Sequence, residues 1–455
     1  MVEVLNVTFD GVSGVARLPD QSDVEWFSKF IGYYSVYHDG TDLLRANADL
    51  TGDGWTVKTL RFNGAGSNKT TVTDLDDGAG RRIDFLELGY NSDVELISTR
   101  ARYIFGWDGE KHEVKLGNQQ DGSTYSINLY ADENIVTTGN AYVQHISTGG
   151  PEGTVIGDVI KIGSGGAGQV QSYDGNDRVT TTTGYVESIS TGDGRDIVKT
   201  SKGYVEFIRA GAGNDKVTIG AGGAETVKTG DGKDVVVTDG GWVGAITTGD
   251  GNDTVKVGGG GAGQVRLGGG DDTIVLSPTD PSYGLSILGG SGSDTISFAK
   301  FKTGIVFTLD SDGAWQNPAA KNGNLDKPGQ GFFQETDIEN LIGSRKNDRL
   351  SGDNADNLLN GGNGNDVLAG AAGDDTLIGG KGKDTFVFAS DAGTDRVRDY
   401  SKSDDTLRIA DHDGGFATLS IADKGGDLEI IHDGGTILLL GAAGTSLGAG
   451  DFDFV

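Results

Sequence analysis

The sequence predicts an all-β fold, a parallel β-solenoid or β-roll with a small N-terminal domain or cap. Three observations predict it. Of the 455 residues 79 are glycine, aspartate recurs every 19 residues in the middle of the chain, and glycine recurs every nine residues farther on. A period of 19 residues holds two short strands and two tight turns but is too short for a helical crossover. Repeats at fixed periods of this kind are typical of coiled, stacked folds.

We expect five parts along the chain. Residues 1–80 form the N-terminal domain or cap, for which no family can be named, and residues 81–300 form a parallel solenoid of 19-residue repeats. Residues 301–341 form a covering loop and a lead-in, with docking as the alternative role of the loop. Residues 342–388 form a roll of nonapeptide repeats, and residues 389–455 form a C-terminal cap.

The 19-residue repeat places aspartate, glycine and aliphatic residues in fixed columns. Glycine lies two residues before nearly every aspartate of the register, and an aliphatic residue lies two residues after it. The segments between the glycines are rich in Val, Ile and Thr, as is typical of strands joined by tight turns. A second aliphatic column, twelve residues after each aspartate, should stack inside the coil and consists of Val170, Ile189, Ile208, Val227, Ile246 and Val265.

The nine-residue repeat begins at Gly343. Residues 361–369 read GGNGNDVLA, which matches the pattern G-G-x-G-x-D-x-U-x at every fixed position. Because the period has halved, both turns of each coil carry the acidic loop and alternate repeats should stack. This places Asp348, Asp366 and Asp384 on one edge and Asp375 on the other edge, beside Asn357.

The charge and the composition limit the partners. The chain has 67 acidic and 37 basic residues, a formal charge of −30, and only 14 of the acids are glutamate. Such a charge repels nucleic acid and anionic membranes unless cations lie between them. The absence of cysteine excludes disulfides, thiolate zinc sites and iron–sulfur clusters. No apolar run predicts a transmembrane segment, and the first residues lack the features of a signal peptide.

The glycine–aspartate turns suit calcium. Glycine permits positive φ and exposes backbone carbonyls, and calcium takes about six to eight oxygen ligands from carbonyls and carboxylates. Asp-Gly turns are common in β-proteins and do not need to recur at a fixed spacing, so turn formation alone does not explain the register. Carboxylates stacked in this register would repel one another without counter-ions. We therefore predict several calcium ions between successive turns, held by Asp177, Asp196, Asp215, Asp234, Asp253, Asp272, Asp294, Asp348, Asp366, Asp375 and Asp384.

Residues 335–455 resemble the C-terminal region of RTX proteins, which carry haemolysin-type calcium-binding repeats and are secreted by type I exporters. The lead-in before Gly343, the repeats and the strands after them are similar to those of the family, and residues 451–455 are similar to its uncleaved secretion signal. The resemblance implies that the type I exporter is a partner during secretion and that residues 389–455 carry the signal. It also implies an extracellular or cell-surface location, where calcium folds the repeats.

The chain shows no recognisable catalytic constellation. Its five histidines are scattered, without the H-E-x-x-H motif of metalloproteases, and we do not expect a lipase-type nucleophile. We expect a secreted calcium-binding protein that is not an enzyme and acts as a surface, matrix or interaction protein, with cell-surface or matrix polysaccharide as a possible partner. An extracellular polysaccharide-active lyase, hydrolase or epimerase on the same scaffold and a surface-layer protein are the alternatives.

An aromatic column follows the aspartates at a distance of eight residues. It contains Tyr185, Tyr204 and Trp242, with Tyr142 upstream, and Glu187, Glu206 and Glu225 form a neighbouring column. We expect the aromatic rings to form a structural ladder and the glutamates to be solvated. Stacking of the rings on sugars and a further cation site at the glutamates are the alternatives.

Overall fold

The computed structural model describes most of the chain from residue 82 onward and separate strands before it. The described residues are 4–9, 12–17, 36–37, 48–50, 55–63, 70–73, 82–88, 92–96, 100–107, 109–117, 124–149, 156–278, 284–309, 333–389, 393–410 and 412–455. The chain divides into two compact units, residues 1–231 and residues 232–455, and each is described by itself.

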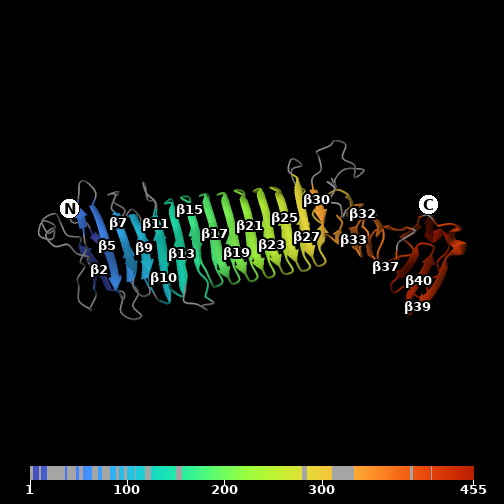
Figure 1. Ribbon diagram of the computed structural model, residues 1–455, viewed down its shortest axis with the longest axis horizontal. Coiled ribbons are helices and arrows are strands. Elements are labelled where there is room, and N and C mark those ends of the chain that lie inside the picture. Colours follow the sequence, from blue (N-terminus) through green and yellow to red (C-terminus); the bar gives the residue numbers. More distant parts are fainter. Residues whose placement is uncertain are drawn as a thin grey trace. The chain divides into compact units, whose positions relative to one another are not determined.

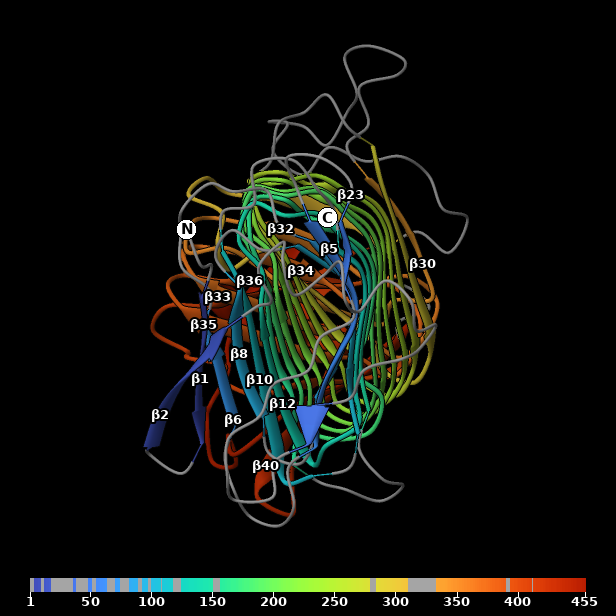
Figure 2. The same cartoon turned by 90° about the vertical axis from the view of Figure 1, so that its left-hand side faces the viewer.

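In the first unit the chain coils through two walls of parallel strands (Figure 1). The first wall consists of β6 (Thr70–Thr73), β8 (Ser92–Leu96), β10 (Lys111–Leu116), β12 (Glu133–Thr137), β14 (Val159–Ile162), β16 (Arg178–Thr181), β18 (Ile197–Lys199) and β20 (Lys216–Ile219). The second wall consists of β5 (Trp55–Asn63), β7 (Arg82–Leu88), β9 (Arg100–Gly106), β11 (Thr124–Leu129), β13 (Val143–Thr148), β15 (Ala167–Gln171), β17 (Val186–Asp193), β19 (Val205–Ala212) and β21 (Ala224–Asp231). Figure 2 shows β8, β10 and β12 side by side in the first wall.

Parallel pairing in this unit reaches β5 and β6, within the residues that the sequence assigns to the N-terminal part. β3 (Val36–Tyr37) is parallel to β5, whereas β4 (Ala48–Leu50) is antiparallel to it. β1 (Val4–Phe9) is antiparallel to both β2 (Val12–Arg17) and β6. The parallel coil therefore starts upstream of residue 81, next to a small antiparallel group of strands.

In the second unit the first wall again has parallel strands that follow one another turn by turn. It consists of β22 (Val235–Thr238), β24 (Thr254–Val257), β26 (Thr273–Leu276), β28 (Thr295–Ser297), β31 (Asn340–Ile342), β33 (Leu358–Asn363), β35 (Thr376–Lys381), β37 (Gly393–Val397) and β41 (Gly435–Leu439). The second wall consists of β23 (Val243–Asp250), β25 (Ala262–Gly269), β27 (Leu285–Ser291) and β30 (Phe333–Thr336).

A third wall is built from alternate strands of the nonapeptide repeats together with strands that precede and follow the repeats. It consists of β29 (Val306–Thr308), β32 (Arg349–Ser351), β34 (Val367–Ala369), β36 (Thr385–Phe388), β38 (Thr406–Ile409) and β42 (Phe452–Phe454). β39 (Ser420–Lys424), β40 (Asp427–His432) and β41 form an antiparallel meander. Two 3₁₀ turns, Gly415–Thr418 and Ala449–Asp451, complete the C-terminal part.

The core is built from the aliphatic columns that the sequence predicts. Val170, Ile189, Ile208 and Val227 on the second wall of the first unit are fully buried, as are Ile246 and Val265 in the second unit. On the first wall, the residue two positions after each aspartate, such as Val179 or Val198, is buried in the same way. Inward apolar residues therefore alternate with outward ones, as the two-residue period of a strand requires.

Most of the predicted covering loop, residues 310–332, lies outside the described residues. β29 precedes this segment and β30 follows it, and each continues a wall of the second unit.

Among the described residues, no helix combines the length and the apolar character needed to cross a membrane. The predicted all-β parallel solenoid is confirmed.

Candidate calcium-binding columns

The structure stacks the predicted aspartates in columns at the turns that lead into the first wall and the third wall. In the first unit Asp158, Asp177, Asp196 and Asp215 occupy successive turns, and at most 3% of each residue is exposed. In the second unit the first-wall column contains Asp234, Asp253, Asp272, Asp294 and Asp375, and the third-wall column contains Asp348, Asp366 and Asp384. All the predicted ligands are therefore buried at turn positions.

A hydrogen bond joins each turn of a column to the next. The backbone N–H of Asp158 donates to Oδ1 of Asp177 at 2.7 Å, and the N–H of Asp177 donates to Oδ1 of Asp196 at 2.7 Å. The third-wall column repeats the pattern, since Asp348 N–H donates to Asp366 Oδ1 at 2.7 Å and Asp366 N–H donates to Asp384 Oδ1 at 2.8 Å. One carboxylate oxygen of each aspartate is therefore used to hold the coil in register.

The other carboxylate oxygen is left for a ligand. Within the described part of the chain, Oδ2 is buried and accepts no hydrogen bond in Asp177, Asp196, Asp253, Asp272, Asp294, Asp366 and Asp375. The hydroxyls of Thr191 and Thr248 lie beside Asp196 and Asp253 and lower the pKa of these two carboxyls. The proton of Thr191 Oγ1 is donated to Ala210 O at 2.9 Å, and that of Thr248 Oγ1 is donated to Leu267 O at 2.6 Å. A buried carboxylate oxygen without a donor is costly unless a cation lies beside it.

The glycines before each aspartate turn backbone carbonyls toward the next loop. Gly194 and Gly213 have φ of 153° and 130°, a region that favours glycine. A Cβ on Gly213 would lie 1.6 Å from Gly194 O, and a Cβ on Gly211 would lie 2.0 Å from Gly192 O. The absence of side chains thus leaves a cradle lined by carbonyl oxygens between successive loops.

Carboxylates alone do not complete a site. Among the described residues, no group of three or more His, Cys, Asp or Glu side chains is placed to hold a metal ion. A cation between two turns must therefore combine the free aspartate oxygens with the glycine carbonyls, a mixture of oxygen ligands that calcium accepts. The residues present fit calcium in this way.

The two edges of the nonapeptide region differ, as the sequence predicts. Asn357 N–H donates to Asp375 Oδ1 at 2.8 Å, so Asp375 stacks on an asparagine. Asn357 Oδ1 accepts the N–H of Asp353 within its own turn at 2.8 Å. An asparagine side chain brings no negative charge to the column, so this turn offers less charge to a cation than its aspartate neighbours do.

The columns extend beyond the predicted ligands. Asp395 Oδ1 accepts the N–H of Asp375 at 3.0 Å, and Asp405 Oδ1 accepts the N–H of Asp384 at 2.9 Å. Glu339 Oε2 accepts the N–H of Asp294 at 2.7 Å. The spacings of 20 and 21 residues hid Asp395 and Asp405 from a search for a fixed period. Asp158 shares the 19-residue register, but Ile156 stands where the other repeats have a glycine two residues before the aspartate.

Two stretches of the chain, residues 335–368 and 360–395, match the model of the RTX calcium-binding nonapeptide repeat, which spans four copies. Residues 335–395 are an RTX repeat segment. The RTX repeats imply calcium binding, and proteins with such repeats are typically secreted. The predicted RTX repeats are confirmed.

A search of the curated proteins found no match. Among solved structures, the chain is similar to the extracellular lipase LipA from Serratia marcescens at 16% sequence identity and a TM-score of 0.18. The match covers 60% of this chain and 45% of the lipase chain, so this chain spans less than half of the lipase.

Burial raises the pKa of the column carboxyls well above the ordinary value of 3.8. The pKa rises to about 8 for Asp177 and to about 6 for Asp196, and in the RTX segment it rises to about 7 for Asp366. Neighbouring carboxylates raise it further, as Asp158 and Asp196 do for Asp177. The nearby hydroxyls of Ser172 and Thr191 and the backbone N–H groups of the adjacent turn lower it but do not offset burial.

The calcium-free protein is expected to lose stability as the pH rises from about 4 to about 8. Over this range the folded state retains protons on buried aspartates that the unfolded state releases, so the free energy of unfolding falls with pH. Urea unfolding of the calcium-free protein at several pH values measures the trend. A midpoint that rises or stays constant over this range would contradict it.

An asparagine at position 196 should separate the two roles of the aspartate. Asp196→Asn keeps the Oδ1 acceptor for Asp177 N–H but replaces the free oxygen by an amide that repels a cation. Asp196→Ala also leaves that N–H unsatisfied, which costs about 1–3 kcal/mol more. We expect both variants to bind fewer calcium ions by native mass spectrometry and only Asp196→Ala to lose this additional stability. Asp239→Asn, at an exposed position outside the columns, should bind the full number. Full calcium loading of Asp196→Asn would contradict the assignment.

The opposite edge of the coil carries the predicted aromatic and glutamate columns. Tyr204 OH donates to Glu225 Oε2 at 2.8 Å, and a hydrogen bond to Glu206 raises the pKa of Tyr185 to about 12. Each of these tyrosines is thus paired with a glutamate of the next turn. These contacts show a polar ladder between tyrosines and glutamates, which fits the expected structural role.

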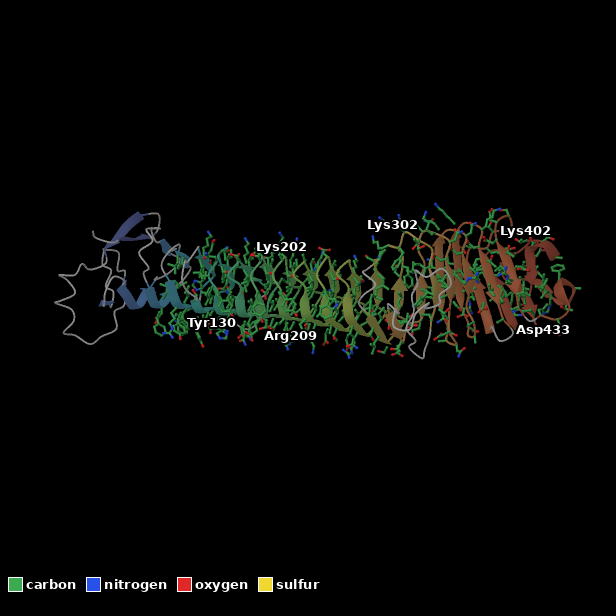
Figure 3. The ribbon with its side chains drawn as sticks, turned by 90° about the horizontal axis from the view of Figure 1, so that it is seen from above. Tyr130, Lys202, Arg209, Lys302, Lys402 and Asp433 are labelled. Atoms are coloured by element: carbon green, nitrogen blue, oxygen red, sulfur yellow. The ribbon has the colours of Figure 1, made fainter. Side chains whose placement is uncertain are left out.

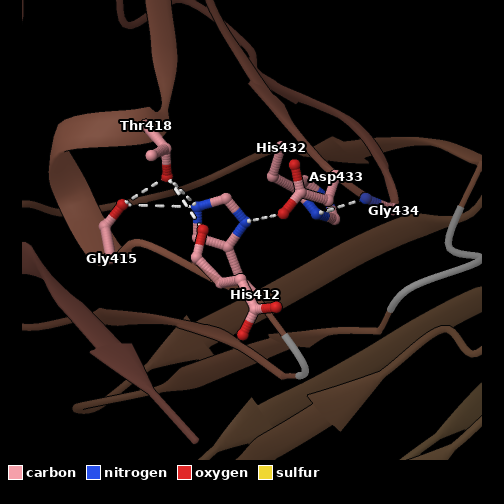
Figure 4. A network of polar contacts seen from close by, with 7 residues as sticks. His412, Gly415, Thr418, His432, Asp433 and Gly434 are labelled. Carbon is pink, nitrogen blue, oxygen red and sulfur yellow. Dashed lines mark hydrogen bonds and ion pairs between the residues drawn. The ribbon is translucent and has the colours of Figure 1, made fainter.

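A histidine near the C-terminus has partners that resemble those of a catalytic base (Figure 4). The side chain of His412 is 1% exposed, its Nδ1 lies 3.0 Å from Asp433 Oδ2, and its Nε2 lies 2.7 Å from Thr418 Oγ1. Thr418 Oγ1 also lies 2.9 Å from Gly415 O, so the histidine and the hydroxyl both contact the 3₁₀ turn Gly415–Thr418. These contacts tie His412 to the 3₁₀ turn and to Asp433.

A serine near the C-terminus also lies in a catalytic sequence pattern. Residues 444–448 read GTSLG, the spacing of the nucleophile elbow around Ser446. An elbow requires a strand before the serine and an α-helix after it. Here the segment follows β41 and precedes a 3₁₀ turn, so the structural context of an elbow is missing.

Proposed function

We propose that the chain is a secreted protein that folds on calcium outside the cell and acts there as a non-enzymatic surface, matrix or interaction protein. The observation that carries the proposal is the row of buried aspartates whose second oxygen accepts no hydrogen bond, repeated turn after turn beside glycine carbonyls. Calcium supplies the positive charge that this row requires. The aspartates and the glycine carbonyls supply its oxygen ligands and place it between turns.

The export route is part of the proposal. RTX repeats are typical of secreted proteins. A chain whose stacked carboxylates repel one another without calcium should remain unfolded where calcium is scarce. Such a chain suits passage through a type I exporter with the C-terminal residues as the signal, followed by folding where calcium is plentiful.

A non-enzymatic role is supported by the use of the polar residues. The column aspartates are taken up by register and by the proposed cations, Tyr204 bonds to Glu225, and His412 contacts a 3₁₀ turn at Thr418. The test is to incubate the calcium-loaded protein with alginate, pectin, ester and peptide substrates and to measure product formation. We expect none, and steady product formation that depends on a described side chain would overturn the non-enzymatic part while leaving calcium-dependent folding intact.

A further inference from the structure

Three strands of the second wall in the first unit have no charged residue. β11, β13 and β15 contain no Asp, Glu, Lys or Arg, although 23% of the chain is charged. The strands on either side do carry charge, with two arginines in β9 and Glu187 and Asp193 in β17. The outer face of these three strands is therefore an uncharged area on a protein of charge −30.

Amide and hydroxyl groups occupy the middle of this area. The parallel register places Asn128 beside Ser147 and Ser147 beside Gln171, at positions that face outward. Gln169 lies next to Gln171 on the same face and is exposed. Amide side chains offer both donors and acceptors, so the middle of the area presents neutral hydrogen-bonding groups in rows about 4.8 Å apart.

Exposed aromatic rings border the same area. Trp107 and Tyr130 are 61% and 43% exposed and stack with ring centroids 6.2 Å apart. Tyr173 is 51% exposed, and its hydroxyl donates to Gln171 Oε1 at 3.1 Å, which joins the border to the middle. Tyr125 is 47% exposed, and its ring centroid lies 5.3 Å from that of Tyr103. In Figure 3 Tyr130 and Arg209 project from the same side of the first unit, opposite Lys202.

We propose that this face, the outer surface of β11, β13 and β15 with Trp107, Tyr130 and Tyr173, binds a neutral polysaccharide. Sugars combine an apolar C–H face, which packs on aromatic rings, with hydroxyls that exchange hydrogen bonds with amides. A protein partner would favour an apolar centre with a polar rim, whereas here the centre is polar and the border aromatic. The three strands carry no Lys or Arg, and the acids Asp132 and Asp174 stand beside the border rings, which favours a neutral chain over an acidic one.

This inference rests on the proposed non-enzymatic binding role and names its partner. The full calcium-loaded chain is tested by native affinity electrophoresis in gels that contain hydroxyethyl cellulose, galactomannan or dextran as neutral probes and alginate as the acidic probe. We expect at least one neutral polymer to retard the protein. Trp107→Ala/Tyr130→Ala should raise the dissociation constant at least tenfold, and Trp107→Ala alone should raise it about threefold. Trp242→Ala, an exposed tryptophan outside the face, should bind as the unchanged protein does.

The failures are distinguishable. If the protein folds on calcium by circular dichroism but no neutral polymer retards it, only the glycan inference fails. If the double variant binds as tightly as the unchanged protein, the face is not the binding site. If only alginate retards the unchanged protein, the ligand is not a neutral polysaccharide. If light scattering shows a dimer that the double variant dissociates while retardation is unchanged, the face joins two copies of the chain. If the chain needs no calcium to fold, the proposed function fails whatever the gels show.

Discussion

Removal of calcium at about pH 8 is expected to abolish most of the β-structure of the folded protein. In the first unit alone, four buried aspartates lie on successive turns, spaced about 4.8 Å apart along the coil. Ionised carboxylates at this spacing repel one another and are poorly solvated, and only the cations between them offset these costs. Backbone hydrogen bonds also join these loops, such as Gly194 N–H to Ala212 O at 2.7 Å, but the glycines add no side chain to the packing.

Circular dichroism during dialysis against a chelator measures the loss, and back-titration with calcium should restore the spectrum in a cooperative transition. Magnesium is the control, since it requires near-octahedral geometry and gives up its water reluctantly, and it should restore little. A spectrum and melting temperature that do not change on calcium removal would contradict the coupling of folding to calcium.

The second large effect is expected from Gly213→Ala. Gly213 has φ of 130°, and an added Cβ would lie 1.6 Å from the carbonyl oxygen of Gly194. Backbone rather than a flexible side chain must therefore move, and it belongs to the loop proposed to hold the cation. We expect the free energy of unfolding in calcium to fall by about 3–5 kcal/mol and the calcium midpoint of folding to rise.

Gly259→Ala is the matched control for this variant. Nothing lies within 4 Å of a Cβ at Gly259, and its φ is outside the left-handed region. This variant should therefore fold and bind calcium as the unchanged protein does. Urea unfolding in saturating calcium compares the two variants. Equal stability of Gly213→Ala and Gly259→Ala would show that the tight stacking of loops does not matter.

Much of the fold could be predicted from the sequence because the repeat is strict. The 19-residue register placed Val170, Ile189 and Ile208 in one buried column, and it placed Asp177 and Asp196 on successive turns. The halved period likewise assigned Asp366 and Asp375 to different edges. A fixed period determines which residues stack, because each turn of a coil must superpose on the next.

Other features could not be read from the period. In Asp196, for example, one carboxylate oxygen accepts the N–H of Asp177 and the other accepts no hydrogen bond. This difference between the two oxygens depends on side-chain geometry, which a period does not contain. Asp395 and Asp405 follow longer turns, so counting residues misses them. The aromatic border at Trp107 and Tyr130 precedes the regular repeats, and the parallel register of β9 and β11 brings its members together over a long sequence separation.

The central claim is that the aspartate columns bind the calcium ions that fold the coil. Native mass spectrometry of the calcium-saturated protein, with circular dichroism on the same sample before and after calcium removal, tests it most directly. The columns predict several tightly bound calcium ions and loss of the β-signal when they leave. A protein that binds no calcium tightly, or that keeps its β-signal after the last ion has left, would contradict the claim.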